Sequence, residues 1–268
     1  MDISVIKSRL SALQNPRGGQ KKDLAQTIWR PTVGKHSVRI VPSVFNKLNP
    51  FKEVYMHYGI NNRTMISLTN FNEKDPIVEF AQGLRKSSEK DNWQLAKKLE
   101  PKMRVFAPVI VRGEEDKGVR LWEFGKQVYM DLLSIAEDED VGDYTDPITG
   151  RDITVETAGK ETTGLMYNTS TVRVRTKSTP LSEDGDKVKL WLETQPDPLG
   201  QFKRYSYDEM KEALLKHLNP EEEIKEQADE VTPKGDLPWE KQAEPKGEYT
   251  LNTTKAAVDS SIDDLFDI

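Results

Sequence analysis

Along the middle of the chain, hydrophobic and polar residues alternate with the two-residue period of β-strands. Segments rich in Gly, Pro and Asn separate these runs, as expected for turns between short strands. The strands predicted in this way cover residues 27–32, 34–41, 53–60, 63–68, 103–111, 119–124, 143–155 (a turn leading into a strand) and 170–176. Helical spacing of apolar residues is found at residues 75–100 and 129–135. Short strands with interposed helices favour an elaborated small barrel over a parallel βαβ sheet, so we expect a mainly β fold with helical insertions (α+β).

The two ends of the chain have different patterns. Residues 1–14 carry apolar side chains at near-helical spacing, but a helix this short is marginal alone and must dock on its own body or on a neighbouring copy. Residues 206–218 predict one helix, with Ser206 or Asp208 as N-cap candidates. Beyond Pro220 the composition is dominated by Pro, Glu, Lys, Thr and Gln without a period, which predicts disorder. We therefore divide the chain into an arm (1–22), a core (23–216) and a tail (217–268).

Charge is segregated between the core and the tail. The chain carries a net charge of −6, yet residues 217–268 alone hold 14 Asp or Glu against five Lys, a net of −9. Residues 1–216 therefore carry +3. Screening limits electrostatics to a Debye length of about 8–10 Å, so a locally basic groove can bind a polyanion despite the overall charge. The last ten residues, 259–268, alternate acids with bulky apolar side chains. Such a tail can occupy a basic groove when it is empty and present a docking peptide when it is full.

Basic and aromatic residues are interleaved on two strands that flank an acidic turn. Alternate residues of a strand share a face, so Lys102, Arg104 and Phe106 point together, as do Arg120, Trp122 and Phe124. One face of this hairpin would offer cations to phosphates and rings to bases, as in sequence-tolerant single-strand binders. An alternative is that Trp122 and Phe124 belong to the core and the basic residues lie on a solvated face. Other strands and turns add candidate DNA-contacting residues: Lys35, Arg39, Tyr55, Tyr58, Arg63, Lys126, Arg173, Arg175 and Lys177.

The sequence offers no sign of catalysis. The chain has no cysteine, which excludes disulfides, thiol nucleophiles and thiolate metal sites. Phosphate loops, metalloprotease motifs and nucleophile elbows are absent from the sequence. The acids at positions 138, 140, 143 and 146 could hold a cation, although they lack the spacing of an EF-hand loop. We expect no cofactor, no metal and no enzyme. No run of 18 apolar residues and no secretory signal pattern are present, so the cytosol is the default location.

Taken together, the layout resembles the single-stranded DNA-binding, helix-destabilising protein of T-even-type bacteriophages. The similarity is loose in each motif but fairly specific in order and spacing, and it covers most of the chain. The matching segments are Ser37–Ser43, the strand with His57, Lys102–Val111, Trp122–Tyr129, the Asp146-Pro-Ile-Thr-Gly turn and the Asp-Asp-Leu-type terminus.

This resemblance implies an oligonucleotide-binding (OB) fold with three functional parts. The arm would mediate cooperative contact with the next protomer, the core would bind DNA, and the acidic tail would compete with DNA and recruit replication, recombination and repair proteins. The positions that match the family's DNA-contacting regions are Arg39, Lys102, Arg104, Phe106, Trp122 and Lys126. Those that match the self-association arm are Ile6, Lys7, Arg9 and Leu10. The partner-binding candidates in the tail are Ile262, Asp263, Asp264, Leu265 and Phe266.

Two departures from the family matter. Family members typically hold a zinc ion through one His and three Cys, and no Cys is present here. Residues 70–100 must then be held by apolar packing, for which the candidates are Phe71, Phe80, Leu84 and Trp93. The arm is also less basic than the resemblance implies, so cooperativity would rely on Arg17, Lys21 and Lys22 or be weaker.

The expectation is therefore cooperative, sequence-tolerant binding of single-stranded DNA during phage DNA replication, recombination and repair. It places the protein in the cytoplasm of the infected host cell, with single-stranded DNA, its own copies and phage proteins as partners, and no membrane. The alternative is an interaction scaffold that does not bind DNA, with buried aromatic residues and scattered basic ones. A third option is a metal-dependent nuclease built on the acids between Asp138 and Asp146.

Overall fold

The computed structural model describes residues 24–87 and 89–219, so the predicted arm and nearly all of the tail lie outside it. The described residues form two compact units. Unit 1 contains residues 24–56 and 103–203, and unit 2 contains residues 57–102 and 204–219 without residue 88. Each unit has its own hydrophobic core.

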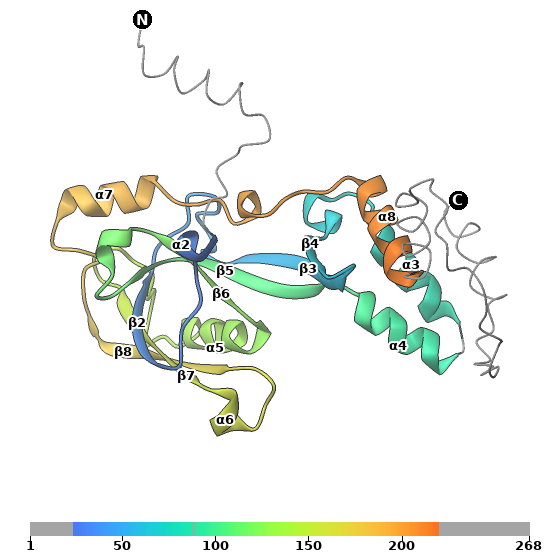
Figure 1. The fold of residues 1–268 in the computed structure, drawn as a ribbon. Coiled ribbons are helices and arrows are strands. Elements are labelled where there is room, and N and C mark those ends of the chain that lie inside the picture. The colour runs from blue at the N-terminus through green and yellow to red at the C-terminus, as the bar shows by residue number, and fades with distance from the viewer. Residues whose placement is uncertain (1–23, 88, 220–268) are drawn as a thin grey trace, which may run out of the picture. The chain divides into compact units, whose positions relative to one another are not determined.

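The protein is a mixed α/β structure with an eight-stranded sheet (Figure 1). Its strands are β1 (Ile28–Trp29), β2 (Gly34–Ile40), β3 (Lys52–Ile60), β4 (Arg63–Ile66), β5 (Lys102–Val111), β6 (Arg120–Phe124), β7 (Arg151–Ala158) and β8 (Thr169–Ser178). The main path runs β1-β6-β5-β2-β7-β8, and β3 pairs with β5 and β4 off this path. Within the described residues β1 and β8 are ends that do not pair, so the sheet is open and the expected barrel closure is wrong. A two-residue β1 has too few backbone groups to close a sheet against the ten-residue β8.

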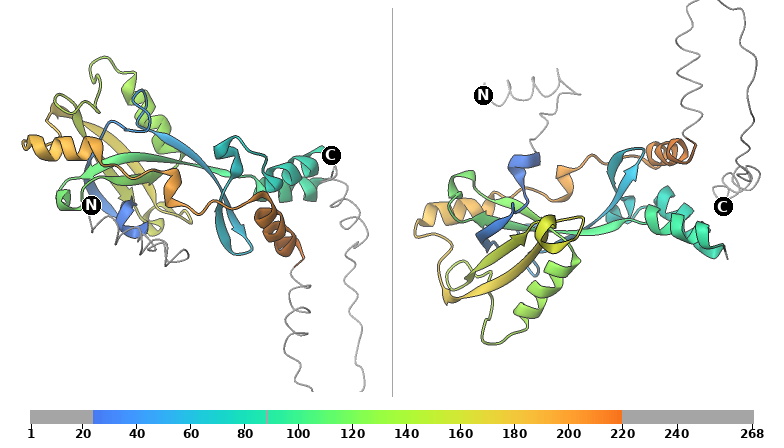
Figure 2. Two further views of the ribbon diagram at one scale, coloured as in Figure 1. Left: turned by 90° about the horizontal axis from the view of Figure 1, so that it is seen from above. Right: turned by 60° about the horizontal axis from the view of Figure 1, so that its bottom comes forward.

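The core of unit 1 lies between one face of the sheet and helix α5 (Lys126–Ala136). The views in Figures 1 and 2 show α5 against the β7–β8 side of the sheet. This face buries alternate apolar residues, as the predicted strand period requires. Its central side chains are Val38, Ile40, Val105, Ala107, Trp122, Ile153 and Val155. A second cluster unites Val41, Ile110, Leu181 and Trp191, the last from helix α7 (Gly185–Glu193), which the sequence pattern did not predict.

Unit 2 is built from the β3–β4 hairpin and three helices, α3 (Pro76–Lys86), α4 (Lys90–Leu99) and α8 (Tyr207–Leu218). The predicted turn between the strands is confirmed, since Asn61 and Asn62 both have positive φ angles, of 46° and 55°. The predicted terminal helix is also confirmed. Ser206 caps α8, its side chain accepting from Glu209 N while the Glu209 carboxylate accepts from Ser206 N.

Short helical turns complete the described chain: α2 (Leu24–Thr27), α6 (Lys160–Thr163), and 3₁₀ turns at Leu68–Phe71, Glu115–Lys117 and Leu199–Gln201. The predicted helical region 75–100 is confirmed as two helices, and the helix predicted at 129–135 begins three residues earlier and ends one later. In this part of the chain no helix has the length and apolarity needed to cross a membrane.

A buried hydrogen-bond hub centred on Asp75 holds unit 2 together. Asp75 caps α3 by accepting from Ile77 N and Val78 N at 3.0 and 3.2 Å. Its other oxygen accepts from the Ser67 hydroxyl (2.6 Å) and Leu68 N (2.9 Å), and lies 3.1 Å from His57 Nε2. The second ring nitrogen of His57 lies 2.8 Å from the Leu99 carbonyl oxygen. One carboxylate thus fastens β3, the turn after β4 and the start of α3.

This hub does not fit the zinc site that the family resemblance implies. Both nitrogens of His57 are already engaged, and no group of three His, Cys, Asp or Glu side chains in the described chain is placed to hold a metal. Apolar packing helps to hold residues 70–100 together, as expected, through buried Phe80 and partly buried Phe71 and Leu84. The expectation for Trp93 is wrong, because this side chain is 45% exposed.

Candidate nucleic-acid interface

The β5–β6 hairpin does not present its cations and rings on one face. Its register places Val105 opposite Phe124, Phe106 opposite Glu123, and Ala107 opposite Trp122. Residues directly opposite each other share a face, so Phe106 and Trp122 lie on different faces of the sheet. The expectation of a single face of rings and cations is therefore wrong. The period-two pattern grouped residues along each strand correctly but could not fix the register between the strands.

Three residues proposed for DNA contact on this hairpin are buried. Trp122 is fully buried in the core beside Trp29 and Phe124, with ring centroids 5.7 and 4.6 Å away. Phe106 is fully buried as well and packs against Phe202. Arg120 is 6% exposed and pairs with Glu114. The structure thus agrees with the alternative in which Trp122 belongs to the core. Phe106 and Arg120 are buried as well and are not exposed to solvent on the hairpin.

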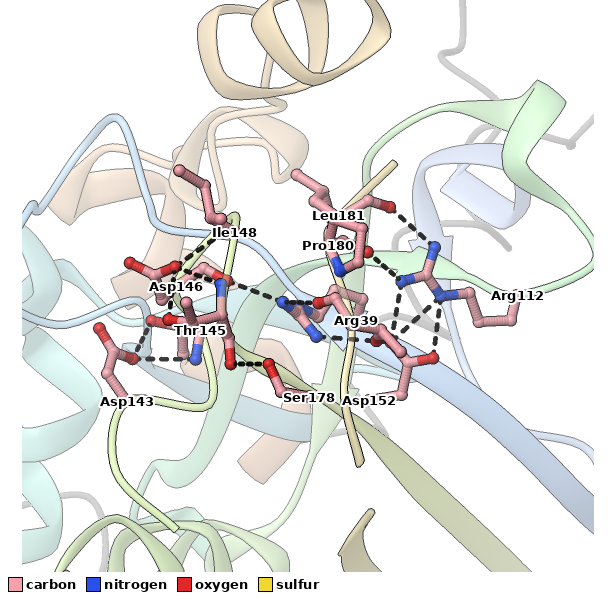
Figure 3. A network of polar contacts seen from close by, with 12 residues as sticks. Arg39, Arg112, Asp143, Thr145, Asp146, Ile148, Asp152, Ser178, Pro180 and Leu181 are labelled. Carbon is pink, nitrogen blue, oxygen red and sulfur yellow. Dashed lines mark hydrogen bonds and ion pairs between the residues drawn. The ribbon is translucent and has the colours of Figure 1, made fainter. Parts of the chain in front are cut away.

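Arg39 is also buried, at the centre of the network in Figure 3. Its Nη2 donates to the carbonyl oxygens of Asp146 (2.7 Å) and Thr179 (2.8 Å), and its Nη1 lies 3.7 Å from Asp152 Oδ1. Burial lowers the pKa of Arg39, and Asp152 opposes this effect. Arg112 makes the closer pair with Asp152, at 2.9 Å. Arg39 therefore has no exposed surface to offer DNA in this structure, because its guanidinium fastens two loops to β2.

A groove with a volume of about 350 Å³ lies in unit 1 where β6 ends and α5 begins. Two of its lining residues, Arg30 and Arg104, flank a common carboxylate, that of Glu123. Arg30 Nε donates to Glu123 Oε2 at 2.7 Å, and Arg104 Nε lies 3.7 Å from Glu123 Oε1. The two arginine side chains are 62% and 43% exposed, whereas that of Glu123 is 11% exposed. The cations therefore face solvent while the acid lies beneath them.

The N-terminus of α5 adds positive potential to this groove. Gly125 is the N-cap, and no side chain in the described chain caps the helix there. Gly125 and Gln127 line the groove, and Lys126 between them is exposed. The unpaired N–H groups at a helix N-terminus carry partial positive charge and favour anions. Arg30, Arg104 and Lys126 give three cations against the one carboxylate of Glu123.

The rim of the groove carries an exposed aromatic ring. The loop between α6 and β8 holds Leu165, Met166 and Tyr167, which are 44%, 95% and 66% exposed. Tyr167 lines the groove together with Ser170 at the start of β8. Three consecutive large apolar side chains in solvent are uncommon on a surface that contacts nothing. A tyrosine beside arginines provides a stacking surface next to phosphate-binding groups.

A cationic strip lies further along β8, on the face of the strand opposite to that of Ser170, which lines the groove. Arg173, Arg175 and Lys177 are all exposed on β8, and Arg173 and Arg175 alternate with Val172 and Val174, which pack on the core. The predicted shared face is confirmed for Arg173 and Arg175, whereas the pairing of β8 with β7 is irregular between Val174 and Ser178, where Lys177 lies. Alternate residues repeat about every 7 Å along a strand. Lys35 of β2 is exposed on the same face, with Glu156 of β7 beside it.

The other predicted residues do not line this groove. Tyr55 is exposed on β3, and its hydroxyl donates to Glu53 Oε2 at 3.4 Å. Burial, followed by the charge of Glu53, raises the pKa of Tyr55. Arg63 is exposed at the start of β4 in unit 2. Tyr58 and Lys102 line a separate cavity of unit 2. The self-association residues of the arm and the partner-binding residues of the tail lie outside the described residues.

Three residues of the groove were missed from the sequence: Arg30, Glu123 and Tyr167. Arg30 follows the two-residue strand β1, which pairs in parallel with β6. Its hydrogen bond to Glu123 joins residues that are 93 positions apart in the sequence. No local pattern reports such a contact. The run Leu165-Met-Tyr167 did carry a signal, because large apolar residues beside Gly164 in a loop indicate exposure or a binding surface.

The acids considered for a nuclease act as turn caps. Asp146 Oδ1 accepts from Ile148 N and Thr149 N at 2.8 and 2.7 Å, and Asp143 Oδ1 accepts from Thr145 N at 2.9 Å. Hydrogen bonds from Thr149 N and Ile148 N lower the pKa of Asp146. These carboxylates form no metal cluster with other acids or histidines of the described chain.

No family model matches the chain, and no curated protein is significantly similar to it.

Proposed function

We propose that this protein binds single-stranded DNA without strong sequence preference, using the groove of unit 1 and the cationic strip of β8. The observation that carries the proposal is the meeting of Arg30, Arg104, the start of α5 and the exposed ring of Tyr167. Cations would neutralise phosphates, and Tyr167 would stack on a base. Single strands would be preferred because a duplex hides its base faces.

The number of cations sets the expected salt dependence. Arg30 and Arg104 in the groove, Lys126 at the start of α5 and the three cations of β8 would together neutralise about six phosphates. For single strands this gives a slope of log affinity against log salt of about −4. Between about 50 and 200 mM salt the affinity would then fall about 300-fold.

The proposal includes the roles implied by the family resemblance. Residues 1–22 would contact the next protomer on the strand, and residues 217–268 would compete with DNA and recruit replication, recombination and repair proteins. The protein would act in the cytoplasm of an infected host cell, without catalysis. We also propose that the open sheet is an elaborated relative of the OB fold, itself a partly open barrel. These parts rest on the sequence pattern and on the resemblance.

The test is a titration of dye-labelled oligothymidylate with full-length protein, followed by fluorescence anisotropy at several salt concentrations. Arg104→Gln should weaken binding and make the slope less negative by about 0.7, because one phosphate contact is lost. The matched control is Lys189→Gln, which removes one exposed cation from α7 of the same unit and should leave the slope unchanged. Absence of binding by the wild-type protein at low salt would refute the proposal.

The non-DNA-binding scaffold remains the competing function, and a specific observation favours it. Phe106 and Trp122 are buried, as that alternative requires. It also requires that basic residues be scattered without a groove, whereas Arg30 and Arg104 meet in one. The same titration separates the two functions.

A further inference from the structure

Unit 2 contains a cavity of its own that combines exposed aromatic rings with lysines. Its volume is about 800 Å³, and its lining includes Tyr58, Trp93, Lys97, Lys98 and Lys102. Trp93 and Tyr58 are 45% and 38% exposed. Among the described residues that line the cavity there is no Asp or Glu, so its lining carries positive charge only.

Helix α4 places the indole and the lysines together. Its buried side is formed by Ala96 and Leu99, which pack in the core of unit 2. Trp93 and Lys97 are four residues apart, one helical turn, and Lys97 Nζ lies 5.6 Å from the centre of the indole ring. Lys102 at the start of β5 donates from Nζ to the carbonyl oxygen of Lys97 at 2.8 Å. The cations are thus gathered around one exposed ring.

A fixed arginine supports the same ring. The Arg85 guanidinium lies 5.3 Å from the indole centre and pairs through two nitrogens with the Glu100 carboxylate. Arg85 does not line the cavity, whereas Lys97 does. The indole is therefore held in place by its neighbours although nearly half of its surface is exposed. Cavities lined by aromatic side chains with a few charged groups are the usual form of ligand sites, so the lining of this cavity points to a ligand.

An exposed ring bordered by lysines matches the chemistry of a nucleotide. Every base has an aromatic face that can stack on an indole, and the adjoining phosphates can pair with ammonium groups. An acidic peptide with apolar side chains would satisfy the lysines as well. The nucleotide is favoured because two aromatic rings, rather than aliphatic side chains, are what the cavity exposes.

We propose that this cavity is a second nucleotide-binding subsite, in which a base of a single strand stacks on Trp93 and its phosphates pair with Lys97, Lys98 and Lys102. The inference rests on the proposed function and extends it, because it assigns a stacking residue to unit 2 independently of the groove of unit 1.

The experiment compares full-length wild-type protein with Trp93→Leu by anisotropy of labelled oligothymidylate and by quenching of tryptophan fluorescence. Trp29, Trp122 and Trp191 are buried, so Trp93 is the most exposed tryptophan of the described chain. Stacking of one base contributes about 1–3 kcal/mol, so Trp93→Leu should weaken binding about 5- to 150-fold and reduce the quenching. Wild-type affinity and quenching in this variant would overturn the subsite while leaving the proposed function intact. Failure of the wild-type protein to bind would overturn both.

A second pair of variants keeps the test decisive if Trp93→Leu does not fold. Lys98→Ala removes a cavity lysine, and Lys90→Ala removes an exposed lysine of the same helix that does not line the cavity. Lys98→Ala should make the salt slope less negative by about 0.7, and Lys90→Ala should not change it. Equal slopes for both variants would overturn the subsite. Quenching of Trp93 by a synthetic peptide of residues 259–268, but not by oligothymidylate, would overturn the nucleotide as its ligand.

Discussion

The Asp75 hub makes a quantitative prediction about the stability of unit 2. Replacing Asp75 by Ala removes the acceptor of Ser67 Oγ, the backbone N–H groups of Leu68, Ile77 and Val78, and the His57 ring. The side chains of Asp75 and His57 are both fully buried, so water does not reach these groups without a structural change. Each buried donor or acceptor that is left unsatisfied costs about 1–3 kcal/mol, and because several groups lose their acceptor together the total is about 3–5 kcal/mol. We expect Asp75→Ala to destabilise unit 2 by about that amount.

A second N-cap aspartate provides the matched control. Asp184 caps α7 in unit 1 by accepting from Asp186 N and Lys187 N, and its side chain is about half exposed. Loss of such an exposed cap costs about 1 kcal/mol. The difference between Asp75→Ala and Asp184→Ala, about 2–4 kcal/mol, therefore measures what burial and the additional hydrogen bonds contribute.

Amide hydrogen exchange measured by mass spectrometry is the suitable assay, because it reports opening free energies for α3 and α7 separately. Asp75→Ala should lower the opening free energy of α3 by about 3–5 kcal/mol and leave α7 unchanged. If both variants cost their own helix about 1 kcal/mol, Asp75 is only a helix cap and the reasoning about the hub is refuted.

The same hub predicts how acid affects unit 2. Burial raises the pKa of Asp75, but the hydrogen bond from His57 and the other donors outweigh it, so its pKa in the folded protein is lowered. Because the pKa of Asp75 is lower in the folded protein, the ionised carboxylate stabilises the fold fully at pH values above the ordinary pKa of 3.8. This stabilisation is lost as the pH falls from that value through the lower pKa of the folded protein. The opening free energy of α3, obtained after correction for the slower intrinsic exchange of amides at low pH, should therefore fall in acid in the wild-type protein. Asp75→Ala should lack this component of the pH dependence.

Three further predictions concern the groove, the Arg39 network and metals. Glu123→Gln removes the carboxylate that Arg30 and Arg104 flank, so affinity for oligothymidylate should rise about fivefold, equivalent to roughly 1 kcal/mol; an unchanged or lower affinity would count against the groove. A Cβ at Gly150 would lie 2.6 Å from Arg39 Nη2, so Gly150→Ala should destabilise unit 1 by about 1–3 kcal/mol in thermal unfolding, unlike an alanine at Gly185, which has open space. Addition of EDTA should leave exchange of α3 unchanged, and acceleration would reveal a metal that the His57 geometry does not accommodate.

Local patterns were enough to predict most elements of this fold. The Ser206 cap, the Asn61-Asn62 turn and the alternating cations of β8 are each determined by residues close together in sequence. These features depend on backbone capping, left-handed turn residues and the strand period, which act over a few positions.

Contacts between distant residues could not be predicted in the same way. The β5–β6 register decides which face Phe106 occupies, and a shift of one residue would reverse it. Arg39 appeared to be a surface cation because its acceptors at Asp146 and Thr179 are more than 100 positions away. The open sheet likewise depends on which strands find partners, and a period-two pattern contains no information about that.

The most direct test of the central claim is photo-crosslinking of the full-length protein to an oligonucleotide that carries halogenated deoxyuridine, with mass spectrometry of the linked peptides. Crosslinks form only to side chains in contact with the modified base, so the measurement locates the single strand on the protein. We expect crosslinks at Tyr167, competed by unlabelled single strands and far less by duplex. Saturated binding without a crosslink in the segment 165–170 would contradict the groove, and absence of any crosslink or binding would contradict the function.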